Sequence, residues 1–413
     1  AAQTRFPPTA YRRTARNSPL GDGRIPCHVR DMSMRRAVFY VLVSVIVLVI
    51  VLSGTTASAL WWYFHPAHVR THGIVYGQRH GQPLHIDVAR PARPNGLGVA
   101  LMVSGGWKSG TNAFRPFMAA PLLRRGYTVF AVTHLSQPDA TVMEIFDDVS
   151  RGIRFIRHHA SEYGIDPDRI GVTGGSAGGH LSLMLATRGS PGPADAPDPV
   201  DRASSAVQAA AIFFPVTDLL NLGQSTENAG DGGPPKSFVK AFGPQSTNLA
   251  VWKAIGRAMS PIYHVTSNMP PVLIVQGGAD TLTPPEQSEW FRDRAREVGG
   301  RVELIVRPGK KHGWLSMLWD IRLFADWFDR HLAQAGPDLF VIFPVVRNPA
   351  RVTPQIKSVP NESSFGDAQR RHLARRRASV IVVATRRPRV VHTPPWSAKP
   401  RSSVLTIGIG SWA

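Results

Sequence analysis

The chain has 413 residues, 43% of them hydrophobic and 18% charged, and its single cysteine, Cys27, excludes an internal disulfide. This length is enough to bury one large core without a second domain. The formal net charge is +20, but residues 1–36 carry eight basic and two acidic side chains and residues 345–413 carry thirteen and two, which leaves 27 basic and 24 acidic side chains between them. The charge is concentrated near the two ends, so no nucleic-acid partner is expected for the region between them.

The N-terminal region divides into two predicted parts. Residues 1–33 mix arginines with prolines and show no hydrophobic period, so we predict a disordered basic extension. Residues 34–64 contain Met34-Arg35-Arg36, then an uncharged apolar run, then the aromatic group Leu60-Trp61-Trp62-Tyr63-Phe64. This pattern indicates a signal peptide or an N-terminal membrane anchor.

The two interpretations of residues 34–64 make different use of the same residues. Ala57-Ser58-Ala59 fits cleavage, whereas the aromatic group suits a membrane interface and favours retention. In either case the arginines stay cytoplasmic, which predicts an extracytoplasmic protein, membrane-anchored or secreted. A buried core helix is the remaining alternative.

Residues 65–340 are predicted to form one α/β domain. Short apolar runs typical of strands recur along it, and from the third onward they alternate with helical segments, which argues for parallel pairing. The predicted strands are Ile74–Tyr76, Leu84–Ala89, Val99–Val103, Tyr127–Val132, Ile170–Thr173, Ala209–Phe214, Val272–Gln276 and Val302–Val306.

A long helix predicted from Val142 to Tyr163 has apolar residues at steps of three or four, which gives it one buried face. Its arginines fall on the other faces and are expected to be solvated partners of nearby carboxylates, with no catalytic function. The arginines are Arg151, Arg154 and Arg157, and the carboxylates are Asp147, Asp148 and Glu162.

A serine flanked by glycines directly follows one predicted strand. The segment Gly174-Gly175-Ser176-Ala177-Gly178 lies between the strand Ile170–Thr173 and a predicted helix, the setting of a sharp turn that presents a strained serine. Glycines two residues before and after Ser176 allow the two backbones to approach closely. We predict Ser176 to be a nucleophile, with an ordinary glycine-rich turn as the alternative.

Acyl transfer to a serine also needs hydrogen-bond donors for the developing oxyanion. One donor is normally the backbone N–H after the serine, here that of Ala177. The loop Ser104–Gly110, after the strand Val99–Val103, offers the second, and its small residues predict Gly105 and Gly106 as donors. Trp107 in that loop either packs in the core or lines a pocket.

Two further strand ends carry the partners that a serine nucleophile needs. Asp280 follows the strand Val272–Gln276, and His312 lies in a glycine-flanked loop after the strand Val302–Val306. We predict Asp280 as the acid and His312 as the general base. The alternatives are a helix cap for the aspartate and a solvated loop residue for the histidine. His180, one helical turn beyond the serine, is expected to buttress the turn by hydrogen bonding.

Two stretches interrupt the alternation of strands and helices. Residues 189–204 are rich in proline and acid, and residues 216–262 contain a glycine-rich part, 223–233, together with three aromatic residues. Long insertions over this edge of a sheet often shape a pocket, so residues 216–262 are a candidate lid. An unstructured surface loop is the alternative for the glycine-rich part. The aromatic residues are Phe238, Phe242 and Trp252.

Several segments resemble the α/β-hydrolase esterases and lipases, in particular the acetyl-esterase-like and feruloyl-esterase-like (BD-FAE) branch. They include GGSAGGH at 174–180, SGGWKSG at 104–110, PPVLIVQGGADTLTPPEQS at 270–288 and VELIVRPGKKHGW at 302–314. The resemblance implies an eight-stranded, mostly parallel sheet with helices on both faces. One departure lies in the oxyanion loop, where many relatives carry HGGGW or HGGAW. Here Val103 and Ser104 stand in place of the histidine and the first glycine, which leaves the substrate class open.

The residues and the resemblance together predict a serine hydrolase that cleaves small carboxylic esters through an acyl-enzyme, with no metal or organic cofactor. The alternatives are a peptidase or amidase on the same triad, or a catalytically silent surface binding module. The expected partners are a small-molecule ester and, if the N-terminal segment is uncleaved, a membrane. Residues 341–413 are predicted to be a disordered tail rich in arginine and proline. A passive extension is favoured over a tail that binds an anionic polymer or membrane.

Overall fold

The computed structural model describes residues 28–110 and 112–333, so the predicted tail 341–413 and most of the predicted extension 1–33 lie outside the described residues. Helix α1, His28–Phe64, begins ahead of the predicted segment 34–64, so residues 28–33 are helical although the sequence pattern predicts disorder there. Within α1, Met34–Phe64 is long and apolar enough to cross a membrane, and an 18-residue window in it has a mean hydropathy of 2.8. A signal sequence fits the same description.

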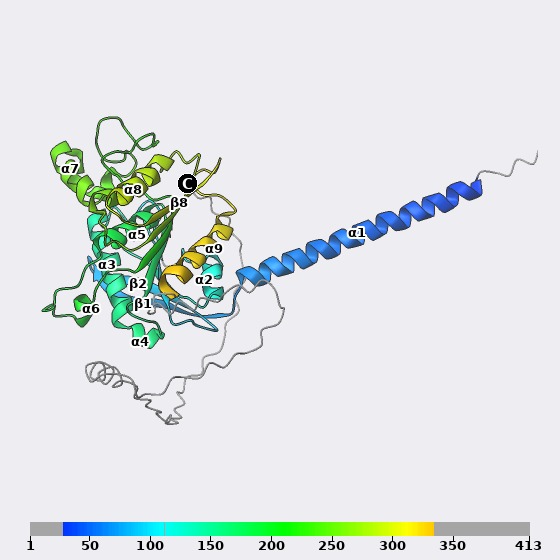
Figure 1. The fold of residues 1–413 in the computed structure, drawn as a ribbon, viewed down its shortest axis with the longest axis horizontal. Helices are drawn as coiled ribbons and strands as arrows, with labels where there is room; N and C mark the ends of the chain where they lie inside the picture. Colours follow the sequence, from blue (N-terminus) through cyan, green and yellow to red (C-terminus); the bar gives the residue numbers. More distant parts are fainter. Residues whose placement is uncertain (1–27, 111, 334–413) are drawn as a thin grey trace, which may run out of the picture. The chain divides into compact units, whose positions relative to one another are not determined.

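The domain has one sheet of eight strands, in the order β1-β2-β4-β3-β5-β6-β7-β8. The sheet lies at the centre of the domain, among the helices (Figure 1). The pairings of β1 with β2 and of β2 with β4 are antiparallel, and the other five pairings are parallel. The predicted mostly parallel sheet is therefore confirmed. The strands are β1 His68–Arg79, β2 Gln82–Pro91, β3 Gly98–Met102, β4 Thr128–Val132, β5 Ile170–Gly175, β6 Ala209–Phe213, β7 Val272–Gly277 and β8 Val302–Arg307.

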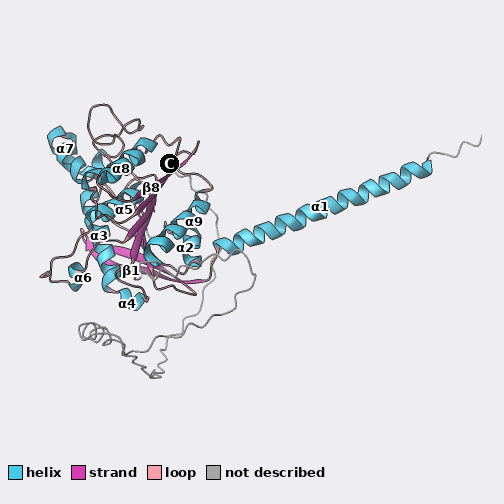
Figure 2. Ribbon diagram, in the orientation of Figure 1, coloured by secondary structure: helices cyan, strands magenta, loops and turns pink. Residues whose placement is uncertain are grey.

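Helices cover both faces of this sheet, as predicted (Figure 2). The helices after α1 are α2 Ala120–Arg124, α3 Val142–His158, α4 Ala160–Tyr163, α5 Ala177–Arg188, α6 Pro199–Arg202, α7 Leu249–Ala258, α8 Pro285–Glu297 and α9 Met317–Phe328. Alternate side chains of a buried strand point to opposite faces, which produces two apolar cores. In β7, Val272 and Ile274 join the core beneath α3, α5 and α8, whereas Leu273 and Val275 join the core beneath α2 and α9.

The arginines of α3 do not have the partners that the sequence predicts. Arg151 donates hydrogen bonds to Asp198 and Asp201, in the proline-rich stretch before β6. Asp148, one of the predicted partners, is buried and pairs instead with Arg79 of β1 at 2.7 Å. The prediction of solvated pairs is wrong because the polar side of α3 faces neighbouring segments, and its charges hold those segments in place.

The insertion at residues 216–262 contains α7 and two 3₁₀ helices, η2 Val239–Phe242 and η3 Pro244–Thr247, and it ends within a third, η4 Pro261–His264. Its glycine-rich part consists of turns and bends. The Ser225 hydroxyl donates to the Leu282 carbonyl at 2.6 Å, and the Thr226 N–H donates to the Thr281 carbonyl at 2.8 Å. These bonds attach the glycine-rich part to the loop after β7, and the lid role stays a prediction.

Candidate active site

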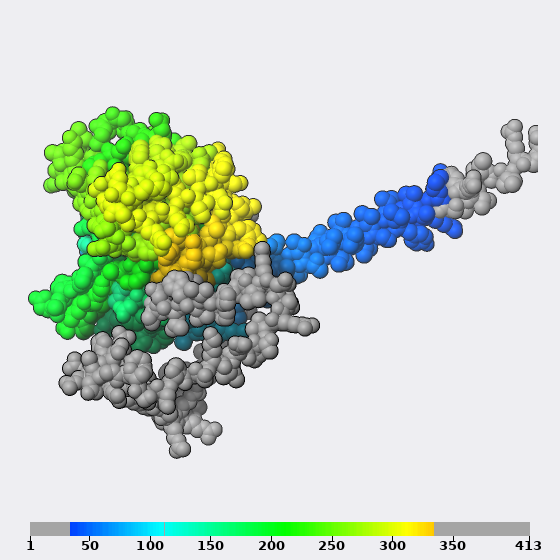
Figure 3. All heavy atoms as spheres, in the orientation of Figure 1, coloured from blue at the N-terminus to red at the C-terminus, as the bar shows by residue number. Residues whose placement is uncertain are grey.

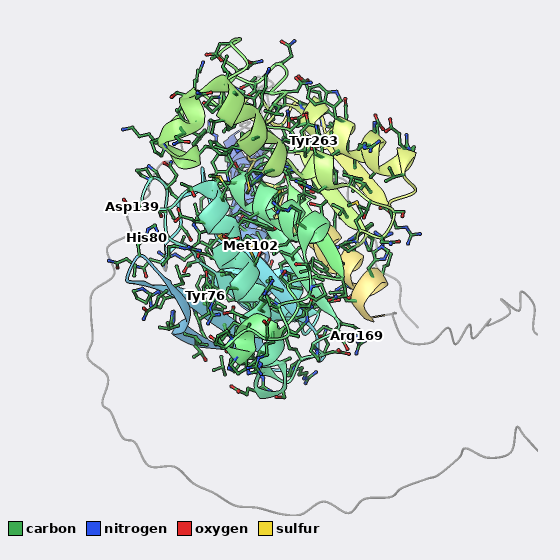
Figure 4. The ribbon with its side chains drawn as sticks, turned by 90° about the vertical axis from the view of Figure 1, so that its left-hand side faces the viewer. Tyr76, His80, Met102, Asp139, Arg169 and Tyr263 are labelled. Atoms are coloured by element: carbon green, nitrogen blue, oxygen red, sulfur yellow. The ribbon has the colours of Figure 1, made fainter. Side chains whose placement is uncertain are left out.

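Ser176 lies at the sharp turn between β5 and α5, with φ 55° and ψ −121°, a conformation that non-glycine residues rarely adopt. Glycines make this turn possible. A Cβ on Gly174 would lie 2.6 Å from the Gly178 backbone, and a Cβ on Gly178 would lie 2.5 Å from the carbonyl oxygen of Met102 in β3. Figure 4 labels Met102 near the middle of the domain. The strand, the turn and the helix therefore meet at backbone contact distance.

Asp280 and His312 approach Ser176 from two other strand ends. Nε2 of His312 lies 3.0 Å from Oγ of Ser176, and Nδ1 of His312 lies 2.8 Å from Oδ2 of Asp280. The aspartate side chain is fully buried, whereas 25% of the histidine side chain is exposed. The three residues selected from the sequence thus form one hydrogen-bonded row at the C-terminal edge of the parallel strands. In a catalytic triad, the nucleophile bonds to the base and the base bonds to the orienting carboxylate, which is the order of these three residues.

The Asp280 carboxylate is held by the turn that follows it. Its Oδ1 accepts the N–H groups of Leu282 and Thr283 at 2.9 and 3.0 Å, and the Thr283 hydroxyl lies 3.0 Å from Oδ2. These bonds offset the cost of burying a charge. Asp280 does not cap the following helix, because the N-cap position of α8 is occupied by Pro284.

Phe214 supports the imidazole from the end of β6. The centroids of the Phe214 and His312 rings are 4.5 Å apart, and the phenylalanine side chain is buried. Its φ of 31° is rare for a bulky residue and is the kind of strain that occurs at functional sites. Sequence reasoning missed Phe214 because it is hidden within an apolar run, although its place just past a strand end is a usable signal.

The predicted oxyanion donors lie on two backbones. Ala177 is the first residue of α5, so its N–H has no acceptor within the helix. In the loop after β3, Gly105 and Lys108 exchange backbone hydrogen bonds of 2.9 Å, and Gly106 and Trp107 form the turn between them with φ values of 53° and 57°. Because the Gly105 N–H already donates to the Lys108 carbonyl, the geometry favours Gly106 as the second donor.

Trp107 and His180 join this loop to α5. The indole Nε1–H donates to Nδ1 of His180 at 3.3 Å, and the imidazole Nε2–H donates to the Met259 carbonyl at 2.7 Å. Burial lowers the pKa of His180 to about 4, which keeps the ring neutral. The expected buttressing by His180 agrees with these bonds. Trp107 packs in the core, with Phe238 and Phe242 of the insertion each at a ring-centroid distance of 5.4 Å.

Ser104, at the departure from the relatives' motif, makes contacts of its own. Nε2 of His134 lies 2.9 Å from the Ser104 hydroxyl, and the other ring nitrogen lies 2.8 Å from the Leu135 carbonyl. The Ser104 carbonyl accepts the Gly178 N–H at 3.1 Å. Ser104 therefore links the oxyanion loop both to α5 and to the segment after β4. Sequence reasoning missed His134, although it stands two residues beyond the end of β4.

No group of three histidine, cysteine, aspartate or glutamate side chains within residues 28–110 and 112–333 is placed to hold a metal ion. The groups that meet at Ser176 are a hydroxyl, an imidazole, a carboxylate and backbone N–H donors. Together they can activate a hydroxyl and stabilise an oxyanion, which is the chemistry of nucleophilic acyl transfer.

Known proteins are similar to this chain in sequence and in architecture. The chain is 30% identical to the probable carboxylic ester hydrolase LipM of Mycobacterium tuberculosis, over 54% of this chain and 51% of that protein. It is 35% identical to the esterase LipQ of the same organism, over 52% and 50% of the two chains. The chain thus spans about half the length of these curated relatives.

A solved structure of a thermophilic esterase from Thermogutta terrifontis is 26% identical, with a TM-score of 0.52 over 66% of this chain and 95% of that one. The sequence also matches the BD-FAE family over residues 86–294, a range that contains Ser176 and Asp280 and ends before His312. Because this match covers half of the chain and the fold agrees with it, the protein belongs to the BD-FAE family of α/β-hydrolases.

Proposed function

We propose that this protein hydrolyses small carboxylic esters through an acyl-enzyme, with Ser176, His312 and Asp280 as its catalytic triad. The observation that carries the proposal is the hydrogen-bonded row from Oγ of the serine through the imidazole to the buried carboxylate, at 3.0 and 2.8 Å. The similarity to proteins named carboxylic ester hydrolase and esterase supports an ester as the substrate.

In the acylation step, Oγ of Ser176 attacks the ester carbonyl carbon while Nε2 of His312 takes the hydroxyl proton. Asp280 accepts the Nδ1–H of the imidazole, which keeps Nε2 unprotonated beforehand and stabilises the imidazolium afterwards. The N–H groups of Ala177 and Gly106 bind the oxyanion, and the N-terminal end of α5 adds its positive dipole.

The tetrahedral intermediate then collapses, and His312 gives its proton to the leaving alcohol. In the second half of the cycle the same imidazole takes a proton from water, which attacks the acyl carbon of the ester formed with Ser176. Proton return to the serine oxygen releases the carboxylic acid. Phe214 keeps the imidazole in one orientation through both halves of this cycle.

Residues 65–340 form the proposed catalytic domain, and residues 216–262 shape its substrate pocket. The support for the second assignment is Phe238, whose ring would lie 2.8 Å from a Cβ placed on Gly106. An insertion side chain is therefore in contact with the proposed oxyanion donor.

We also infer that residues 34–64 hold the domain at a membrane, on its extracytoplasmic side. The support is that α1 is long and apolar enough for a membrane span, and that Arg35 and Arg36 stand before its apolar run.

A panel of p-nitrophenyl esters with rising acyl length tests this proposal. Wild type is expected to turn over the acetate, and Ser176→Ala is expected to lose at least about 1,000-fold in kcat. Ser182→Ala, which removes a buried hydroxyl from α5, is the matched control and should keep kcat within about threefold. A fluorophosphonate probe should label Ser176 in the wild type. Equal turnover by wild type and Ser176→Ala, or no turnover by either, contradicts the proposal.

A further inference from the structure

The segment that follows the proposed base is apolar and partly exposed. After His312 the chain continues Gly313-Trp314-Leu315-Ser316-Met317-Leu318-Trp319, and it leads into α9. Leu315 is 92% exposed and Trp319 is 40% exposed. Phe117, in the 3₁₀ helix η1 (Pro116–Ala119) that contacts α9, is also exposed. In Figure 3 the part of the chain from β8 to α9, in yellow and orange, lies on the face that is shown.

The C-terminal end of α1 contacts this same segment. The ring of Trp319 has centroid distances of 5.2 Å to Tyr63 and 5.3 Å to Phe64. On the neighbouring helix α2, Arg124 donates to the Tyr63 carbonyl at 2.6 Å and lies 3.8 Å from the centroid of the Trp62 ring. The aromatic end of the candidate span therefore packs between α2 and the beginning of α9.

The connection from α1 to the sheet is too short to let the domain move away from a membrane. Only three residues separate Phe64, the last residue of α1, from His68, the first residue of β1. The four residue steps from Phe64 to His68 span at most about 14 Å when fully extended. Trp61 and Trp62, each 67% exposed, are side chains that favour the boundary between lipid and water.

We infer that Leu315, Trp319 and Phe117 form a surface that enters the lipid boundary beside the end of α1, and that the site receives esters held in that bilayer. This inference rests on the proposed esterase function and on the proposed anchor. Scattered exposed apolar residues are ordinary, but these three lie on segments that pack together next to the span. Leu315 lies three residues after His312 in the same loop. The residue that would contact lipid and the proposed base are therefore held by one segment. The occupant of the surface is lipid, and the substrate is an ester whose apolar part stays in the bilayer.

Fluorescence quenching in vesicles tests the lipid contact without using turnover. The full chain with Cys27→Ser and Leu315→Cys carries an environment-sensitive label and is reconstituted into vesicles that contain brominated lipids. We expect blue-shifted emission and at least twofold quenching at position 315. Val75→Cys, on an exposed apolar position of β1, is the matched control and should remain unquenched, whereas Val47→Cys in α1 should be quenched strongly. A label at 315 that behaves like the one at 75 overturns the inference, as does an unquenched label at 47.

Turnover in the same vesicles tests the source of the substrate. The quantity measured is the ratio of turnover of a long-chain ester embedded in the vesicle to turnover of soluble p-nitrophenyl acetate. Leu315→Asp is expected to lower this ratio at least tenfold, because a carboxylate resists entry into the lipid boundary, and Val75→Asp, at an exposed position of β1 outside the proposed pocket, should leave it within twofold. Equal ratios for the two variants overturn the inference. Failure of wild type to cleave the soluble ester contradicts the proposed function instead, and the quenching result does not depend on it.

Discussion

In the proposed triad, the buried carboxylate of Asp280 determines which imidazole nitrogen of His312 carries the proton. Replacing it by an amide keeps the size of the side chain but offers the imidazole a donor as well as an acceptor. Asp280→Asn is therefore predicted to lower kcat by about 10,000-fold with little change in KM, because the tautomer with an unprotonated Nε2 is no longer favoured. Steady-state kinetics on p-nitrophenyl acetate measure the effect. Asp148→Asn, at a buried aspartate paired with Arg79, is the control, and a loss below tenfold for Asp280→Asn would contradict the assigned role.

Gly178 shows how strictly the turn at the serine depends on close backbone contact. A methyl group at this position would meet the carbonyl oxygens of Met102 at 2.5 Å and Ser104 at 3.3 Å, and neither can rotate away. Gly178→Ala is predicted to lower the free energy of unfolding by about 3 kcal/mol. Urea denaturation measures this change. Gly110→Ala, where a Cβ meets nothing within 4 Å, should change stability by less than about 1 kcal/mol, and equal losses in both variants would be inconsistent with the contact.

At the scale of elements, two neutral histidines connect the oxyanion loop to its surroundings. Burial lowers the pKa values of His134 and His180 to about 4, from an ordinary value of 6.5. Between these values the unfolded chain binds more protons than the folded chain, so stability falls as the pH drops from about 6.5 toward 4. Above about 6.5 neither state is protonated at these sites, and their contribution is constant. The expected loss is about 3 kcal/mol for each histidine.

Thermal unfolding between pH 7 and pH 4.5 should therefore show a falling midpoint below about pH 6.5. NMR titration of the two imidazoles in the folded wild type is the more direct measurement, and it needs no substitution. A signal from either ring that titrates near 6.5 would show that the ring is not held neutral. His134→Gln with His180→Gln should flatten the pH dependence of stability in that interval.

Several elements of the fold could be predicted from the sequence because their signals are local. The strand β7 is a short apolar run that ends in glycines, and the turn at Ser176 is marked by glycines that backbone contact requires. The partners of the arginines in α3 could not be predicted in this way, because they are distant in the sequence. Their partners Asp198 and Asp201 lie in a stretch brought alongside only by folding, and spacing within the helix pointed to the wrong carboxylates.

The candidate site shows the same division between local and distant information. Ser176, Asp280 and His312 each follow a strand, and parallel strands deliver their C-terminal ends to one edge. Phe214 also follows a strand, but an aromatic in an apolar run is indistinguishable from a core residue. Gly105 could not be separated from Gly106 by sequence, because a hydrogen bond across the turn to Lys108 decides which N–H is available.

At the scale of the whole molecule, most of the net positive charge lies near the chain ends. The tail at residues 341–413 is predicted to be passive, so its deletion should leave turnover of p-nitrophenyl acetate within twofold of the full chain. The physical reason is that the proposed substrate carbonyl is uncharged and the described domain contains every proposed catalytic group. The matched measurement is the thermal midpoint of both forms. A tenfold loss of kcat at an unchanged midpoint would show that the tail takes part in catalysis.

The three residues between Phe64 and His68 have a kinetic consequence. With α1 held in a membrane as proposed, an enzyme tethered so closely diffuses in two dimensions to reach its substrate. Its velocity then follows the mole fraction of ester among the lipids and is insensitive to the volume of surrounding buffer. Diluting a vesicle suspension should leave the rate per molecule unchanged, whereas adding inert lipid to the same vesicles should lower it in proportion.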